Sequence, residues 1–372
     1  MRVVYFLPKY SFFENGVRGR TSHAHGFLSG LKANNIDCLL VSGPGYQELY
    51  GSTDIENKVL EPKLVSRINI LWVAHSAIQI LLDRRINLSD AILIVRYSTS
   101  MSVLTSLLFG LFWKGRTVYE INSIGYHQID FRSKTLLNLV LAIEKKVIAV
   151  FDVALCISRN ISRDLASQDI SSFVLPNGSS LPANKLKRIR RKNPRFIYLG
   201  GYQPYYDFEQ LFRCFLRARI PAGKLHMYGN RNRYAADFPQ YVDNRSILFK
   251  GAYDLSGLLS NDVLSLCDVF VLPNGRNRMA RIGSPTKLFE YLSFGSRIIF
   301  QDYGQARDIL SGLTGAYAYQ DDDTLIRNLE LLADQFDNEF KSPATSAEYL
   351  ATYTWEARVR EFQAYLEEPV FV

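Results

Sequence analysis

The feature that most constrains the fold is an alternation of short apolar strands with helical segments, which runs along the chain and restarts once at Arg195. Short apolar runs flanked by helices are typical of buried parallel strands. Two sets of strand–helix units joined by a linker predict an α/β protein with two Rossmann-like, doubly wound domains facing a cleft. The expected strands are 3–7, 38–42, 91–96, 117–121, 153–157, 172–175, 195–199, 225–228, 246–249, 269–272 and 297–300. The expected helices are 22–34, 136–150, 159–166, 209–217, 255–266, 325–336 and 355–366.

Length supports the same division, because 372 residues exceed one typical hydrophobic core. We place the domains at 1–185 and 186–350. A C-terminal helical segment, 351–372, is expected to pack back on the first domain.

The net charge of +8 is unevenly distributed. Residues 1–185 hold 20 basic and 14 acidic side chains, residues 186–195 add six basic ones, and residues 196–372 hold 18 basic and 22 acidic ones. The basic run is either a solvated linker or a contact for an anionic membrane surface. A nucleic-acid partner is not expected, because no helix-turn-helix, zinc-finger or RNP pattern accompanies the charge.

Location is constrained by the cysteines and the apolar runs. The four cysteines are scattered without metal-ligand spacing, which indicates buried thiols in a reducing compartment, the cytoplasm. Residues 1–7 already read as a strand rather than as a signal peptide. The longest apolar run, 103–113, is too short to cross a bilayer. It predicts a buried helix or, alternatively, an in-plane membrane anchor with Trp113, Lys114 and Arg116 at the interface.

One motif carries chemistry: GSPTKLFEYLSFGS, residues 283–296. Pro285 suits a first helical turn, and the Ser284 hydroxyl is expected to cap the helix. The N–H groups of a helix start attract anions, and Lys287 adds a positive charge one turn in. Glu290 shares a helix face with Thr286. Phosphates on the helix start and a ribose diol on Glu290 would suit a nucleotide sugar; the plainer alternative is an ordinary capped helix.

Other motifs extend this pattern along the chain: YEINS at 119–123, VLPNG at 174–178, YLGGY at 198–202, FKG at 249–251, CDVFVLPN at 267–274 and YTWEAR at 353–358. Each is weak alone. In their order and spacing they resemble family-four retaining glycosyltransferases, which have the GT-B fold. The resemblance implies that the first domain binds the acceptor and the second the nucleotide sugar. It also implies a reaction on the positioned donor that needs neither a cofactor nor a metal.

The resemblance assigns roles to individual residues. Glu290 matches the glutamate that holds the donor ribose, and Gly19 matches a loop glycine that lets the backbone approach the donor phosphate. Glu120 falls where many members place a group near the reacting centre, and His127 is a second candidate for that role. The implied donor-binding residues are Gly19, Arg20, Gly200, Gly201, Arg278, Ser284, Pro285, Thr286, Lys287, Leu288 and Glu290.

Three positions depart from the family pattern. Ile282 stands where a second glutamate is usual, and Gly201 and Tyr206 stand where an arginine and a lysine usually neutralise the diphosphate. The diphosphate would then depend on other cations: Arg18, Arg20, Arg276, Arg278, Arg281 and Lys287.

The resemblance thus implies a metal-independent, retaining glycosyltransferase that moves a sugar from a nucleoside diphosphate to a saccharide hydroxyl. The acceptor is expected to be lipid-linked, in polysaccharide or glycoconjugate synthesis, with the enzyme cytoplasmic and peripheral at the inner face of the membrane. The three departures support an alternative, a non-catalytic GT-B protein that binds a partner or a glycan. Epimerisation is a weaker alternative, because no convincing acid–base set is present. The run Asp321–Asp323 is expected to cap a helix rather than bind metal.

Overall fold

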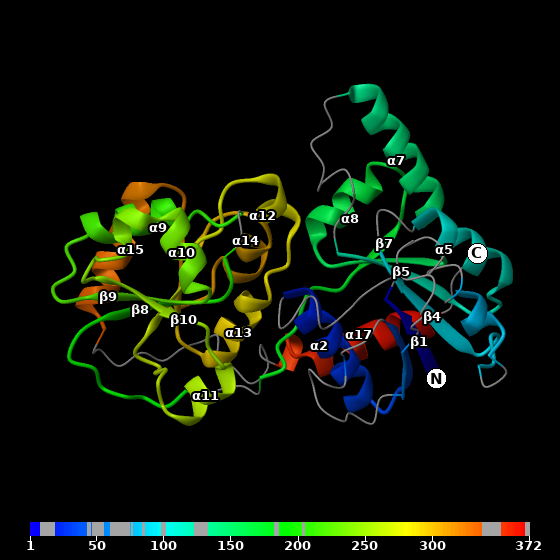
Figure 1. Cartoon of the computed structure of the whole chain (residues 1–372), viewed down its shortest axis with the longest axis horizontal. Helices are drawn as coiled ribbons and strands as arrows, with labels where there is room; N and C mark the ends of the chain where they lie inside the picture. The colour runs from blue at the N-terminus through cyan, green and yellow to red at the C-terminus, as the bar shows by residue number, and fades with distance from the viewer. Residues whose placement is uncertain are drawn as a thin grey trace. The chain divides into compact units, whose positions relative to one another are not determined.

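The computed structural model describes residues 1–7, 19–42, 46, 56–59, 75, 77–83, 86–97, 102–122, 133–181, 186–202, 205–336 and 351–368. The chain forms two compact units (Figure 1). The first combines Met1–Gly178 with Trp355–Val372, and the second is Ser179–Thr354.

The first unit is built on a parallel sheet in the order β3-β2-β1-β4-β5-β6-β7. Its central strands are buried on both faces, as expected for a sheet covered by helices. The strands are β1 (Arg2–Phe6), β2 (Asp37–Ser42), β3 (Glu56–Val59), β4 (Ala91–Arg96), β5 (Thr117–Ile121), β6 (Val153–Cys156) and β7 (Ser172–Val174). The helices are α2 (Gly19–Ala33), α5 (Ser102–Phe112), α7 (Lys134–Ile148), α8 (Arg159–Ala166) and α17 (Trp355–Glu367).

The second unit repeats this plan with a parallel sheet in the order β10-β9-β8-β11-β12-β13. The strands are β8 (Arg195–Leu199), β9 (Lys224–Tyr228), β10 (Ile247–Gly251), β11 (Val269–Leu272), β12 (Arg297–Gln301) and β13 (Ala316–Tyr319). The helices are α9 (Phe208–Arg217), α10 (Arg231–Asp237), η1 (Pro239–Tyr241), α11 (Leu255–Ser260), α12 (Arg278–Ile282), α13 (Thr286–Phe294), α14 (Gly304–Leu310) and α15 (Asp322–Asp334).

Both sheets follow the doubly wound order in which the third, second and first strands precede the fourth, fifth and sixth. The strand order reverses between β1 and β4 in the first unit, and between β8 and β11 in the second. Ligands of doubly wound sheets bind outside the carboxyl ends of the strands at this reversal. The predicted α/β class and doubly wound sheets are therefore confirmed.

The C-terminal helix α17 completes the first unit by packing on α2. Trp355 is buried, and its ring lies edge-on to His23 with centroids 5.0 Å apart. A Cβ on Gly26 would come within 1.9 Å of Trp355 Nε1, so only glycine permits this approach. Asn34 Nδ2 also donates a hydrogen bond to the Glu356 carbonyl at 2.9 Å.

The basic run belongs to the second unit and lies against residues 262–268. Its backbone is hydrogen-bonded there, with Ile189 N–H donating to Ser265 Oγ at 2.9 Å and Leu266 N–H to Lys187 O at 3.1 Å. Arg195 forms a bidentate ion pair with the fully buried Asp268. The stretch is therefore not a free linker, although Lys187, Arg188, Arg190 and Lys192 are exposed, as expected for a solvated run.

Two further expectations are corrected. The predicted helix 255–266 ends at Ser260, because Asp262 adopts a left-handed conformation with φ of 53°. Trp113 is not at an interface: it is buried, and its Nε1 donates a hydrogen bond to Ala91 O at 3.1 Å. All four cysteines are buried and unbridged. None of the described helices is both long enough and apolar enough to cross a bilayer.

Candidate functional site

The loops that follow β8 and β11 are joined to each other at the strand reversal of the second unit. Gly275 N–H donates to Tyr205 O, and Asp207 N–H donates to Pro273 O, each at 2.8 Å. Tyr206 and Asn274 form an isolated antiparallel bridge between the same loops. Gly200 itself is held at the carboxyl end of β8 by its N–H, which donates to Tyr228 O at 3.0 Å.

Helix α13 is attached beneath the same strand end. The Tyr291 hydroxyl accepts a hydrogen bond from Leu199 N–H at 2.9 Å. Pro285 is the N-cap of α13 and no side chain caps this helix, so the expected Ser284 cap and the placement of Pro285 in the first turn are wrong. The Leu288 side chain is buried in the core, and its N–H donates to Pro285 O. By helix geometry the N–H groups of Thr286 and Lys287 have no partner within α13.

Lys287 extends from this helix start across Gly200. A Cβ on Gly200 would come within 1.6 Å of Lys287 Cε, and Gly200 has a φ of +149° that side-chain-bearing residues rarely adopt. The Lys287 ammonium donates to the Tyr206 hydroxyl at 3.2 Å and lies 5.0 Å from the Tyr206 ring centroid. A positive charge is therefore held beside the residue that replaces the family's lysine.

Glu290 lies one turn further along α13. In the described part of the chain, no side chain hydrogen-bonds to its carboxylate. Burial raises the pKa of Glu290, and the charge of Lys287 opposes that rise. Burial likewise lowers the pKa of Lys287, opposed by Tyr205 and Glu290. The two groups therefore form a desolvated pair in which each favours the charged form of the other.

The remaining second-unit candidates differ in position. A Cβ on Gly201 would meet no atom of the described residues within 4 Å. Arg278 is the first residue of α12 and is exposed. The charge of Arg276 acts on Asp321 and Tyr319. Ile282, which replaces the family's second glutamate, is fully buried.

In the first unit, Glu120 lies near the end of β5 within a buried polar cluster. Its carboxylate accepts hydrogen bonds from the Tyr5 hydroxyl at 2.5 Å and from Asn122 Nδ2 at 2.9 Å. His23 Nε2 lies 2.5 Å from Glu120 Oε1, and His23 Nδ1 contacts Asn177 Oδ1. Sequence reasoning missed the pairing with His23 and Asn177, because only the fold brings these distant residues together.

The electrostatics of this cluster keep Glu120 ionised. Burial raises the pKa of Glu120, but the charges of His23 and Arg96 and the hydrogen bonds from His23 and Tyr5 outweigh it and lower the pKa to about 2. A carboxyl group with such a pKa has no proton to donate near neutrality. Its geometry suits holding and orienting His23.

Two parts of the predicted site lie outside the description. His127 and the loop that precedes Gly19 fall outside the described residues. Gly19 and Arg20 begin α2, but their side chains are also outside the description.

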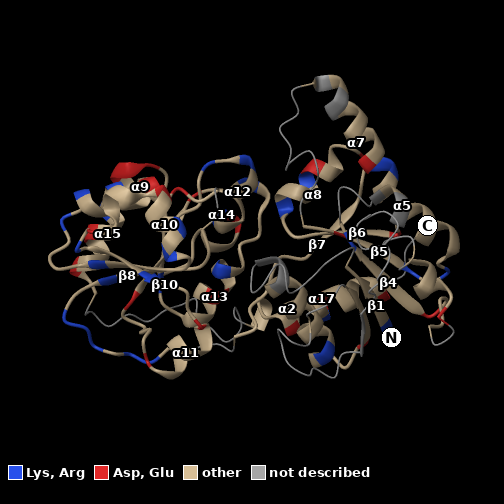
Figure 2. Cartoon of the chain, in the orientation of Figure 1, with Lys and Arg blue, Asp and Glu red and all other residues tan. Residues whose placement is uncertain are grey.

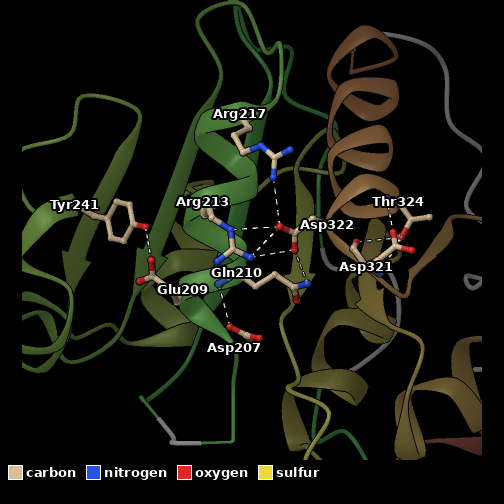
Figure 3. Close-up of polar contacts among 9 residues, drawn as sticks. All are labelled: Asp207, Glu209, Gln210, Arg213, Arg217, Tyr241, Asp321, Asp322 and Thr324. Atoms are coloured by element: carbon tan, nitrogen blue, oxygen red, sulfur yellow. Dashed lines mark hydrogen bonds and ion pairs between the residues drawn. The ribbon is translucent and has the colours of Figure 1, made fainter.

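The acidic run at 321–323 opens α15 (Figure 3). Asp321 is the N-cap and forms a capping box with Thr324, as expected from sequence. Asp322 accepts hydrogen bonds from Gln210 at 2.9 Å and from Arg213, which ties α15 to α9. Among the described residues, no three His, Cys, Asp or Glu side chains are grouped so that they could hold a metal ion.

No protein-family model matches the chain, and no curated protein matches it. Solved structures match along nearly its whole length. Sucrose-phosphate synthase from Thermosynechococcus elongatus gives a TM-score of 0.72 at 12% identity, covering 99% of this chain and 98% of that one. The lipopolysaccharide outer core galactosyltransferase WaaB gives 0.69 at 14% identity, covering 98% and 99%. HepE from Anabaena, in complex with UDP and glucose, gives 0.69 at 12% identity, covering 99% and 100%. These similar structures are GT-B glycosyltransferases, and the chain therefore has the GT-B fold.

Proposed function

We propose that the protein is a retaining glycosyltransferase that moves a sugar from a nucleoside diphosphate to a hydroxyl of a saccharide. The observation that carries this proposal is the position of Lys287 across Gly200, with its ammonium beside Tyr206 and Glu290 one turn away. In a doubly wound sheet, ligands are expected at the carboxyl ends of the strands where the strand order reverses. This arrangement lies at that position in the second sheet.

Each group has a chemical task in this proposal. The Lys287 ammonium and the N–H groups at the start of α13 bind the diphosphate. The Glu290 carboxylate accepts hydrogen bonds from the ribose hydroxyls. The lack of a side chain at Gly201 lets the donor approach the backbone closely. Among similar structures, HepE was solved with UDP and with UDP-glucose, which supports a uridine nucleotide as the first donor to test.

In the proposed reaction the bond between the sugar C1 and the diphosphate oxygen breaks, and a bond from C1 to the acceptor oxygen forms on the same face. The departing diphosphate takes the acceptor's proton. The charge that develops on the diphosphate is the feature that Lys287 stabilises, and the protein mainly positions the two substrates. No step requires a metal or a cofactor.

The finer parts of the proposal rest on sequence alone. These are retention of configuration, independence of a metal, a lipid-linked saccharide as acceptor, a role in polysaccharide or glycoconjugate synthesis, and a cytoplasmic location. The alternative is a non-catalytic GT-B protein, and the burial of Ile282 in place of a second glutamate favours it.

A panel of UDP-, GDP- and ADP-sugars separates the two. Release of nucleoside diphosphate from one of them, slow without acceptor and faster with one, is expected for the enzyme. Donor binding by calorimetry without release, or no binding to any donor, would contradict the enzyme and favour the non-catalytic alternative.

Variants test the site itself. Glu290→Ala should lose about 1.5–3 kcal/mol of donor binding, the usual range for hydrogen bonds to charged groups.

Lys287→Ala should weaken nucleoside diphosphate binding, and this loss should shrink as salt rises. Adding Arg278→Ala should increase the loss. Tyr206→Phe removes the hydroxyl that accepts from Lys287 but leaves the cation in place, so its loss of affinity should be smaller than that of Lys287→Ala. Wild-type affinity in both charge variants at low salt would remove the anion site.

A further inference from the structure

The largest group of exposed apolar side chains lies far in sequence from the donor-site candidates. The described part of the chain exposes twelve large apolar side chains, and seven of them belong to α5, α7 and the turn after α7. Each is at least 41% exposed. They are Val103, Leu107, Leu111, Phe112, Leu139, Ile143 and Val150. Scattered exposed leucines need no explanation, whereas such a concentration marks an interaction surface.

The spacing of five of these residues places them on one face of each helix. Val103, Leu107 and Leu111 follow one another at intervals of four along α5, and Leu139 and Ile143 do the same along α7. In the described part of α7, the charged residues lie toward the end of the helix (Figure 2). Helix α5 has none in its sequence, SVLTSLLFGLF.

The two helices are in direct contact. A Cβ on Gly110 of α5 would come within 2.1 Å of Val150 Cγ1, just beyond the end of α7. Trp113 fixes the end of α5 to the sheet through its hydrogen bond to Ala91 O. The exposed apolar residues therefore lie on two helices that contact each other, and we call this group the α5–α7 face.

Charged residues at the edge of the α5–α7 face indicate which kind of partner would bind it. Lys114 follows α5, and Lys145 and Lys146 lie in the last turn of α7; all three are exposed. Of the nearby acids, Glu144 is buried and accepts from Tyr97, Asp152 accepts from Thr117 N–H at 2.7 Å, and the exposed Asp90 accepts from Asn87 Nδ2 at 2.6 Å. Asp169 offsets only Lys145, at 3.4 Å. An apolar face bordered by lysines is complementary to an anionic lipid surface. A two-fold contact with a second copy would place the same lysines on both sides.

We propose that the α5–α7 face is an interfacial membrane-binding surface. It lays Leu111, Phe112 and Ile143 into the acyl boundary of an anionic bilayer while Lys114 and Lys146 contact the head groups. This surface is distinct from the basic run at 186–195, and it does not depend on the proposed sugar transfer.

Vesicle sedimentation tests the apolar part. The wild-type chain should sediment with phosphatidylglycerol-containing vesicles and much less with pure phosphatidylcholine. The double variant Leu111→Ser with Phe112→Ser should bind at least about tenfold more weakly, since each buried methylene contributes to insertion. The matched control is Leu216→Ser with Leu331→Ser, two exposed leucines of the second unit, which should bind like wild type. No sedimentation of the wild type, or equal loss in both double variants, would overturn the proposal.

A second arm tests the charges and separates this face from the basic run. Lys114→Gln with Lys146→Gln should weaken binding about tenfold at low salt, because each basic side chain near an anionic surface contributes on the order of 1 kcal/mol. Lys187→Gln with Lys192→Gln should have a smaller effect. The reverse ranking would place the contact on the basic run and contradict the proposal.

A label reports insertion directly. Since all native cysteines are buried, Leu111→Cys can be labelled selectively with an environment-sensitive dye, with Leu331→Cys as control. The dye at 111 should shift to the blue on anionic vesicles and the dye at 331 should not. An unshifted signal at 111 in vesicle-bound protein, or a dimer that the serine variant dissociates, would overturn the proposal.

Discussion

Gly200 determines how closely a cation can lie against the end of β8. Gly200→Ala would place a Cβ against Lys287 Cε and force a residue with a side chain to a φ of +149°. We expect a loss of about 1–3 kcal/mol in the free energy of unfolding, together with weaker nucleoside diphosphate binding.

Gly201→Ala is the matched control, because its Cβ would meet no atom of the described residues within 4 Å. Its free energy of unfolding should stay within about 0.5 kcal/mol of wild type, while donor binding falls if the donor approaches this backbone closely. Urea unfolding and calorimetry check both variants. Equal stability of the two variants would show that Lys287 does not lie across Gly200 in solution.

The buried Glu120 makes stability depend on pH. Its pKa is lowered from the usual 4.5 to about 2, so the unfolded chain binds its proton first as pH falls. The stabilisation is complete above pH 4.5 and is lost as pH falls toward 2. Each pKa unit corresponds to about 1.4 kcal/mol, so the loss is on the order of 3 kcal/mol.

Urea unfolding between pH 7 and pH 3 measures this contribution. Glu120→Gln should unfold more easily at pH 7 and show a shallower decline with falling pH than wild type. If Glu120→Gln does not fold, Tyr5→Phe offers a milder test, because it removes one hydrogen bond to the carboxylate. Parallel pH profiles for wild type and Glu120→Gln would contradict the assignment.

At the scale of elements, the start of α15 is fixed by two carboxylates with separate roles. Asp321 caps the helix, while Asp322 joins it to α9 through Gln210 and Arg213. Asp321→Ala should destabilise the chain by about 1 kcal/mol, the usual value of an N-cap. Asp323→Ala, an exposed neighbour, should cost less. Thermal unfolding checks the ranking, and a larger loss for Asp323 would contradict it.

How far the sequence predicts the elements depends on what ends them. The bounds of β4, β5, β8, β11 and α8 match their predicted ranges, because apolar runs with clear neighbours define them. The end of α11 could not be predicted, since a left-handed Asp262 terminates it without a glycine. Strand β13, AYAY, was missed because its short sequence lacks a distinct apolar run.

The candidate site shows the same limit. Local motifs predicted Lys287 and Glu290 on one helix start, because they lie in one short segment. The contact of Lys287 with Gly200 and Tyr206, and of His23 with Glu120, depends on long-range packing that no local pattern encodes. The exposure of one face of α5 was also unpredictable. A helix made only of apolar residues has the same sequence pattern whether it is fully buried or exposed on one face.

At the scale of the whole molecule, the chain leaves the first unit after Gly178 and returns to it at Trp355. The second unit is therefore inserted between two parts of the first. Trp355 is 4% exposed and packs between His23 and Phe27 of α2, so it secures the returning segment. A change at Trp355 should then affect the first unit without altering the donor-site residues of the second.

Trp355→Ala should remove about 3–5 kcal/mol from the stability of the first unit, the usual range for a buried tryptophan. Hydrogen exchange followed by mass spectrometry should show faster exchange in α2, β1 and β5, with β8, β11 and α13 unchanged. Nucleoside diphosphate binding should persist, because Lys287 and Glu290 lie in the second unit. Leu331→Ala, an exposed site on α15, is the control and should leave both units protected. Equal acceleration of exchange in both sheets would show instead that the two units unfold as one.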